Sequence, residues 1–210
     1  MNNLRFNKVF LSSCLVALLV NGCGGNVAPP PPVITPAADT QLNCDTYVTG
    51  TTAKDDFLCA HNAVRATANP VPSPELPALS WNDNLATVAQ AWADQCNWSH
   101  NPDRAAEYNS LSGEATSVGE NLYLTTFSNP APDAAVTAWA AEASSYDYAT
   151  NSCATGEVCG HYTQLVWRDT LNVGCGMKLC STVAGTTMTN ATIMVCNYEM
   201  AGNWIGVAPY

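Results

Sequence analysis

Residues 160–168 read GHYTQLVWR, and residues 193–206 read IMVCNYEMAGNWIG. The first stretch predicts a short helix over residues 160–167. The β-branched and apolar residues from Val173 to Leu179 and from Thr192 to Tyr198 predict two strands that pair through the loop between them. This end of the chain is therefore expected to supply a sheet.

Three helices are predicted upstream of these strands, over Asp55 to Ala68, Asp83 to Asn97 and Pro132 to Ser145. Each carries apolar side chains at the three- and four-residue spacing of an amphipathic helix. Pro70 ends the first helix, and Pro132 fits the first turn of the third. Because helices outnumber strands and the strands cluster late, the pattern predicts an α+β fold with helices packed on a sheet.

The composition is typical of one folded domain with a tail. The 210 residues are 47% hydrophobic and 11% charged, which argues against disorder over most of the chain. There are 17 acidic and 7 basic residues, a net charge of −10, whereas nucleic-acid binding needs a basic face. We therefore expect no nucleic-acid partner. The 10 cysteines indicate an oxidising compartment or metal sites.

The first 22 residues resemble a lipoprotein signal peptide. Arg5 and Lys8 precede the apolar run Val9 to Val20, which is shorter than the about 20 residues needed to span a bilayer. The run ends in LVNGC at residues 19–23, similar to a bacterial lipobox, so Cys23 is predicted to carry lipid after cleavage. Plain secretion and an uncleaved membrane anchor are the alternatives. The predicted location is the cell envelope, lipid-anchored at the outer membrane or cell surface, or otherwise outside the cell.

Residues 23–50 are predicted to be a Pro/Gly-rich tether, and residues 51–210 the globular domain. Cleavage would remove two of the 7 basic residues and none of the 17 acidic ones, which leaves a net charge of −12. With Cys14 removed and Cys23 lipidated, eight of the 10 cysteines remain. This even set predicts four disulfides rather than a zinc site, because the chain has no Cys-x-x-Cys pair.

The stretches at residues 160–168 and 193–206 resemble the two signatures of the superfamily of cysteine-rich secretory proteins, antigen 5 and pathogenesis-related 1 proteins, the CAP superfamily. Shorter motifs agree: HNAVR at 61–65, LSWNDNL at 79–85, CNWSH at 96–100 and GENL at 119–122. The resemblance runs from about Asp55 to Tyr210, and the ending NWIGVAPY is most similar to the plant pathogenesis-related 1 branch. It implies a three-layer α-β-α sandwich stabilised by disulfides.

The resemblance also implies the disulfide pairing. Its positions pair Cys153 with Cys159, Cys175 with Cys196, and Cys96 with Cys180. Cys44 and Cys59 are then left to each other.

A cleft with two histidines and two acids is a further implication, at His100, Glu120, Glu142 and His161. Imidazole nitrogens and carboxylate oxygens suit a divalent metal such as zinc, which we expect as an optional rather than a required cofactor. The same groups could act as general acid and base. The alternative is a buried polar network that orders the floor of the cleft without metal or chemistry.

Three functions are compatible with these features. The first is a non-enzymatic exported protein that binds a sterol, a lipid or a protein partner. In relatives, the loop matching Tyr146 and Tyr148 is linked to sterol binding, and a loop anchor is the alternative role. The second is a metal-dependent hydrolase acting on envelope or host substrates. The third is a disulfide-stabilised interaction or defence protein whose acidic surface meets a basic partner.

The first function is favoured over catalysis. The chain has neither a His-Glu-x-x-His helix nor a Gly-x-Ser-x-Gly elbow. Asn101 follows His100 at a position where relatives often have a serine, so a hydroxyl nucleophile is missing there.

Other side chains are expected to be structural. His61 lies on the apolar side of its helix, and Gln164 and Asn197 are predicted to tie loops to the backbone. The six tryptophans are expected to anchor the core. They are Trp81, Trp92, Trp98, Trp139, Trp167 and Trp204.

Overall fold

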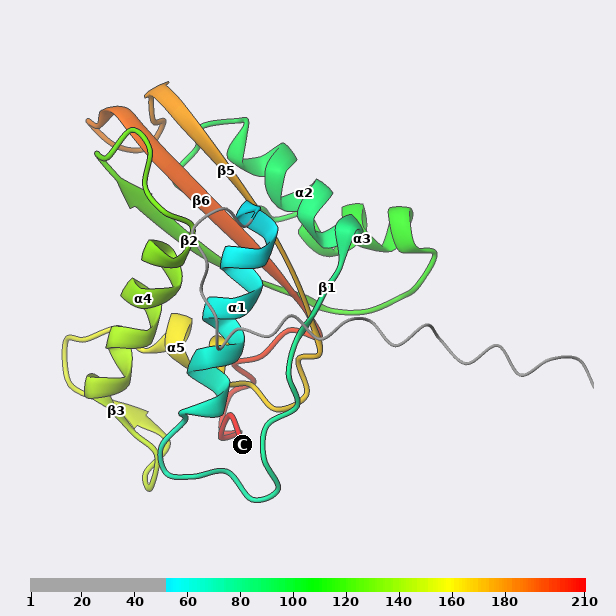
Figure 1. The fold of residues 1–210 in the computed structure, drawn as a ribbon, viewed down its shortest axis with the longest axis vertical. Helices are drawn as coiled ribbons and strands as arrows, with labels where there is room; N and C mark the ends of the chain where they lie inside the picture. Colours follow the sequence, from blue (N-terminus) through cyan, green and yellow to red (C-terminus); the bar gives the residue numbers. More distant parts are fainter. Residues whose placement is uncertain (1–51) are drawn as a thin grey trace, which may run out of the picture. The chain divides into compact units, whose positions relative to one another are not determined.

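The computed structural model describes residues 52–210 (Figure 1). The predicted signal peptide, the tether, Cys23 and Cys44 lie outside the described residues. Over residues 52–210, no helix combines the length and the apolar character that crossing a membrane requires.

A four-stranded sheet with the strand order β1-β5-β6-β2 forms the middle layer. The long central strands β5 (Asn172–Thr182) and β6 (Thr189–Glu199) run antiparallel. They confirm the predicted strand pair and extend beyond the predicted bounds at both ends. β1 (Ser80–Trp81) pairs with β5 in parallel, and β2 (Val118–Thr125) runs antiparallel to β6.

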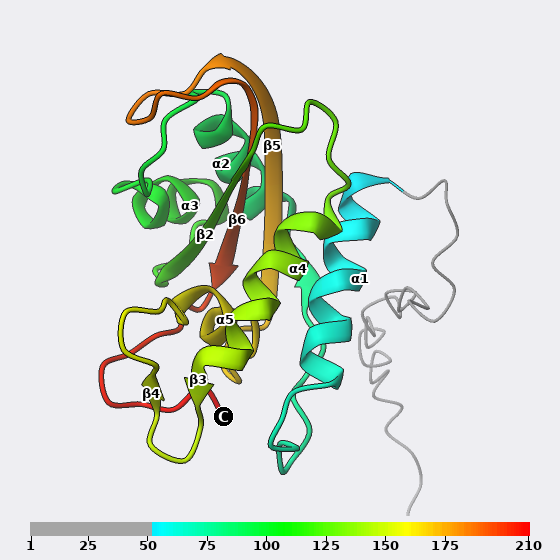
Figure 2. The ribbon, with the colours of Figure 1, turned by 90° about the vertical axis from the view of Figure 1, so that its left-hand side faces the viewer.

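Helices cover both faces of this sheet (Figure 2). One face carries α1 (Ala53–Ala66), α4 (Asp133–Ala141) and the short α5 (Gly160–Leu165). The other face carries α2 (Asp83–Ala93) and α3 (Arg104–Ser112). This is the three-layer α-β-α arrangement that the family resemblance implied.

The side chains of β6 alternate between two cores. Met194 and Tyr198 pack with α1, α4 and α5 on one face. Ile193 and Val195 pack against α2 on the other face. Because both faces are covered, the middle of the strand is a continuous apolar run from Ile193 to Cys196, as is typical of a strand buried on both sides.

A short excursion connects α4 to α5. The 3-10 helix η1 (Glu142–Ser145) continues α4, and a two-stranded sheet of β3 (Tyr146–Asp147) and β4 (Ser152–Cys153) follows. The predicted third helix therefore ends as an α-helix at Ala141, and its last turn tightens to 3-10 geometry.

Besides the two-residue strands β1, β3 and β4, two longer elements are absent from the sequence-based prediction. α3 buries a single side chain, Tyr108, so it has no apolar stripe for periodicity to detect. β2 has the polar residues Glu120 and Asn121 at buried positions in its middle, so it does not show the apolar pattern of a buried strand.

Several predicted helix bounds also differ: α1 ends at Ala66 rather than Ala68, and α5 ends at Leu165 rather than residue 167. α1 begins two residues earlier than predicted, because Thr52 and Asp55 form a capping box at its start. α2 ends at Ala93, four residues early, and the chain then turns at Cys96, whose φ is 52°. The disulfide from Cys96 to Cys180 of β5 holds this turn against the sheet.

Three of the predicted disulfides are confirmed. They are Cys96–Cys180, Cys153–Cys159 and Cys175–Cys196. Cys59 is disulfide-bonded, and its predicted partner Cys44 lies outside the described residues.

The expectation that all six tryptophans anchor the core is wrong for two of them. Trp92, Trp139 and Trp167 are buried, whereas Trp98 is 39% exposed and Trp204 is 57% exposed. The indole of Trp204 donates to the carbonyl of Ala201, three residues away. Its loop therefore presents an aromatic face to solvent.

Candidate cleft site

His100 and Glu120 form one half of the predicted cleft. His100 lies in the loop between α2 and α3, and its Nδ1 is 2.8 Å from Oε1 of Glu120 on β2. The same oxygen accepts a hydrogen bond from the backbone N–H of Asn101 at 3.0 Å. The side chain of Glu120 is completely buried and that of His100 is 57% exposed. The imidazole therefore has one edge on a buried carboxylate and the other toward solvent.

His161 and Glu142 form the other half. Glu142 begins η1, and its Oε1 is 2.6 Å from Nδ1 of His161. Its Oε2 accepts from the backbone N–H groups of His161 and Tyr162, at 3.0 and 3.1 Å, in the first turn of α5. The ring of His161 also stacks on Trp139, with ring centroids 6.2 Å apart. Glu142 thus both caps α5 and orients the histidine.

The two pairs share one proton arrangement. An ionised carboxylate only accepts hydrogen bonds, so each histidine donates from Nδ1, and in a neutral ring Nε2 then carries the lone pair. Neither His100 nor His161 makes a hydrogen bond through Nε2 to another of the described residues. Metal-ligating histidines are commonly held in this way, with the second nitrogen on a carboxylate. The acids therefore lie where they orient the histidines, rather than standing as equal members of a four-ligand set.

Asn121 connects the two halves through β2, and the sequence did not single it out. Its Nδ2 donates to the backbone carbonyl of His161 and to the hydroxyl of Tyr198, both at 3.2 Å. Because successive strand residues point to opposite faces, Glu120 and Asn121 serve the two histidines from the two sides of one strand. The position of Asn121 in the GENL motif, beside Glu120, was the only sequence signal for this role.

His61 lies at the end of the same polar chain. Its Nδ1 donates to the carbonyl of Phe57 at 2.7 Å, and its Nε2 accepts from the hydroxyl of Tyr198 at 2.9 Å. Burial lowers the pKa of His61 to about 4. It is a neutral core residue with both ring nitrogens occupied, which agrees with its expected structural role.

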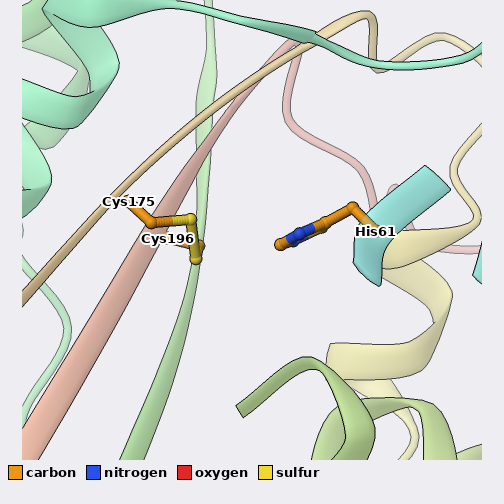
Figure 3. Close-up of side chains that lie close together, drawn as sticks. All are labelled: His61, Cys175 and Cys196. Atoms are coloured by element: carbon orange, nitrogen blue, oxygen red, sulfur yellow. A yellow bond between two sulfur atoms is a disulfide. The ribbon is translucent and has the colours of Figure 1, made fainter. Parts of the chain in front are cut away.

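His61 also lies beside the Cys175–Cys196 disulfide (Figure 3). Among the described residues, these three bring potential metal-ligand atoms within 4.8 Å of one another. The two sulfurs are bonded to each other, so no thiolate is available. This group packs in the core and is not a metal centre in the oxidised protein.

The two tyrosines that were predicted to contact a ligand have different surroundings. Tyr146 lines a cavity of about 290 Å³ together with Trp167, Trp204 and Val207. Its hydroxyl donates to Oδ1 of Asn151 at 2.7 Å. Tyr148 stacks instead on the ring of Tyr210, with centroids 4.6 Å apart.

Gln164 and Asn197 were both predicted to connect loops to the backbone by hydrogen bonds, and only one of them does so. Gln164 accepts from the N–H of Gly202 at 2.9 Å and donates to Thr170 at 3.0 Å, which confirms its role. The prediction for Asn197 is wrong, because neither polar atom of its buried side chain has a hydrogen-bond partner among the described residues. Asn197 lies on β6 between β2 and β5, and its side chain is on the sheet face that α2 covers.

Comparison with known proteins agrees with this architecture. Residues 58–198 match the cysteine-rich secretory protein family, CAP. The chain is 38% identical over 156 residues to human GLIPR1-like protein 1, a match that covers 74% of this chain and 62% of that relative. The chain thus spans about three fifths of that relative's length.

Two solved structures share the fold. Schistosoma mansoni venom allergen-like protein 4 superposes with a TM-score of 0.58 at 25% identity, covering 73% of this chain and 91% of that one. NaASP2, solved with Zn²⁺, superposes with a TM-score of 0.57 at 23% identity, covering 75% of this chain and 84% of that one.

The chain therefore belongs to the cysteine-rich secretory protein (CAP) family. Its three observed disulfides, together with this membership, indicate an exported protein.

Proposed function

We propose that this CAP domain is a non-enzymatic binding module of the cell envelope whose cleft holds a divalent metal, best matched by zinc. The arrangement of His100 and His161 carries the proposal. Each imidazole is fixed by a carboxylate through Nδ1 and keeps Nε2 for a ligand. Neutral imidazole nitrogens are common zinc ligands, and two protein ligands would leave room for water or a bound molecule.

The carboxylates support binding rather than catalysis. Both oxygens of Glu142 are occupied by hydrogen bonds from His161 and Tyr162. Oε1 of Glu120 is occupied by His100 and Asn101. A general base must reach the proton that it takes, and three of the four carboxylate oxygens already accept hydrogen bonds within the site. Asn101, at the position where relatives often have serine, uses its amide to contact Glu107.

Zinc titration by calorimetry, together with native mass spectrometry of protein purified from its own envelope, tests the metal part. We expect one zinc ion per chain, lost in His100→Ala and in His161→Ala, and retained in the control Glu75→Gln at an exposed site. A folded wild type that binds no zinc would refute it. If both histidine variants fold, lose zinc and keep every measured activity, the competing hydrolase function is excluded.

A second candidate function is binding of a sterol or lipid in the cavity beside Tyr146. Three aromatic side chains in its lining could contact an apolar ligand beside polar groups such as Asn151 and Asn203, but the volume of about 290 Å³ is at the lower limit for drug-sized ligands. Trp204 lines this cavity, whereas the neighbouring Ile205 is fully exposed and does not. A fluorescent sterol assay should lose saturable binding in Trp204→Ala and keep it in the matched control Ile205→Ala. Equal loss in both variants, or no saturable binding by the wild type, would refute this function.

Anchoring by a lipidated Cys23 and binding of a protein partner complete the proposal. The tether would hold the domain near the membrane surface, where an acidic domain attracts basic partners. Mass spectrometry of the mature amino terminus tests the anchor, and an unmodified Cys23 would refute it. Partner binding that persists at high salt would contradict the electrostatic version of the interaction.

A further inference from the structure

Two side chains beside the cleft have buried polar atoms without a hydrogen-bond partner in the described part of the chain. The atoms are Oε2 of Glu120 and both Nδ2 and Oδ1 of Asn197. The Glu120 side chain and Asn197 are each 0% exposed. Buried polar groups are nearly always hydrogen-bonded, to protein or to ordered water. The Glu120 oxygen and the Asn197 amide group therefore each require a partner.

The register of the sheet places these atoms together. Glu120 of β2 lies directly opposite Asn197 of β6, so their side chains share one face, with Cβ atoms about 4.5–5.5 Å apart. Figure 1 shows β2, β6 and β5 side by side in this sheet. The neighbour of Asn197 on β5 is Gly174, which has no side chain to offer. Helix α2 approaches Gly174 so closely that a Cβ there would lie 2.2 Å from the backbone nitrogen of Ala86.

The neighbouring polar groups are already committed. Glu199, the next residue of β6 on this face, accepts from the hydroxyl of Tyr108 at 2.7 Å and from Nδ2 of Asn172 at 3.1 Å. Oε1 of Glu120 is held by His100 and by the N–H of Asn101. Asn197 and Oε2 of Glu120 are thus left to each other, without a direct hydrogen bond between them.

We propose that one buried water joins the amide of Asn197 to Oε2 of Glu120, and that Asn197 is thereby a positioning residue for the His100 half of the cleft. The water accepts from Nδ2 and donates to Oε2, a bridge that suits an enclosed polar site with at least two partners. Fixing Oε2 fixes the plane of the carboxylate. Oε1 then holds Nδ1 of His100, and this sets the direction of Nε2. Only the consequence for zinc rests on the proposed function.

The zinc measurement uses Asn197→Leu, which keeps the approximate size of the side chain and removes both polar atoms. We expect zinc affinity to fall about tenfold, at the low end of the effect of outer-shell partners. In a Glu120→Ala background the same substitution should have no further effect, because no carboxylate remains to be positioned. Val195→Ala is the control, on the same face of β6 and buried. It should lower stability and leave zinc affinity unchanged. Additive effects of the Asn197 and Glu120 substitutions would overturn the proposal.

Two readouts do not depend on zinc. At fixed pH, nitrogen-15 NMR should show the Nδ1–H signal of His100 shifted or lost in Asn197→Leu, with that of His161 unchanged. A high-resolution crystal structure should show a water within hydrogen-bonding distance of both Glu120 Oε2 and Asn197. A dry site, or an unchanged His100 signal in a folded variant, would overturn the proposal. A wild type that binds no zinc but passes both tests would refute the proposed metal function and leave this inference standing.

Discussion

Protonation of His61 should make folding stability fall as the solution becomes mildly acidic. The residue is fully buried, and its pKa is lowered from 6.5 to about 4. Burial is the main cause, because it penalises the charged imidazole. The positive charge of the nearby Arg65 acts in the same direction, whereas the hydrogen bond to the carbonyl of Phe57 opposes it. The folded state therefore holds His61 neutral at pH values where the unfolded chain takes up a proton.

The direction and the size of the stability change follow from this difference in pKa between the folded and unfolded states. Above pH 6.5 the imidazole is neutral in both states, and its full contribution is present. Between pH 6.5 and about 4 the unfolded state binds more protons, so stability is lost as pH falls. A difference of about 2.5 pKa units at about 1.4 kcal/mol per unit gives a loss of about 3 kcal/mol at pH 4.

Urea denaturation with the disulfides intact, at pH 7, 5.5 and 4, measures the free energy of unfolding. Other groups also titrate over this range, so the informative quantity is the difference between wild type and His61→Leu, which cannot take up the proton. The variant should lose about 3 kcal/mol less between pH 7 and pH 4. The control, Val195→Ala, truncates a buried side chain that has no titratable group, so its pH slope should follow the wild type.

Equal pH slopes for wild type and His61→Leu would refute the reasoning. If the leucine variant does not fold, nitrogen-15 NMR of the wild type tests the protonation state of His61 directly. The His61 ring should remain neutral at pH 5, and a protonated ring in the folded protein would contradict the prediction.

Three further predictions concern stability, measured by urea unfolding. Arg65→Lys should cost about 2–4 kcal/mol, because lysine cannot reproduce the four hydrogen bonds that the buried guanidinium gives to backbone carbonyls; a loss below about 1 kcal/mol would count against this. Gly174→Ala should destabilise by about 3 kcal/mol or more, since its Cβ would lie 2.2 Å from a backbone nitrogen of α2. In the control Gly156→Ala the new Cβ meets no neighbouring atom. That variant should lose only what a positive φ costs a residue with a side chain, about 1–2 kcal/mol. A disulfide that closes a longer loop restricts the unfolded chain more, so its removal should cost more stability. Removing Cys96–Cys180, which spans 84 residues, should cost about 4.5 kcal/mol, and removing Cys153–Cys159, which spans 6, about 2 kcal/mol. Equal losses would contradict this argument.

Local pattern explains most of what the sequence predicted correctly. β5 and β6 are rich in apolar and β-branched residues, and a short loop joins them, so their pairing is the simplest arrangement available. The amphipathic helices were found because each must bury a stripe of side chains against the sheet. The disulfide partners and the four cleft residues came from motifs at matching positions in the family resemblance, not from spacing.

The missed elements have little local signal. α3 buries only Tyr108, and β2 places Glu120 and Asn121 at buried positions that sequence patterns assign to apolar residues. Trp98 and Trp204 were misassigned because an aromatic side chain indicates burial only on average. These features depend on contacts with residues distant in the chain.

The sequence by itself determined the family, the α+β fold, three observed disulfides and the membership of the two-histidine, two-acid group. Only the tertiary structure decided how that group is arranged. The distances join His100 to Glu120 and His161 to Glu142, with both carboxylates turned to Nδ1. The register of β2 against β6 set Asn197 opposite Glu120. The physical reason is that a hydrogen bond depends on distance and direction between side chains that are far apart in sequence, and packing of the folded chain fixes both.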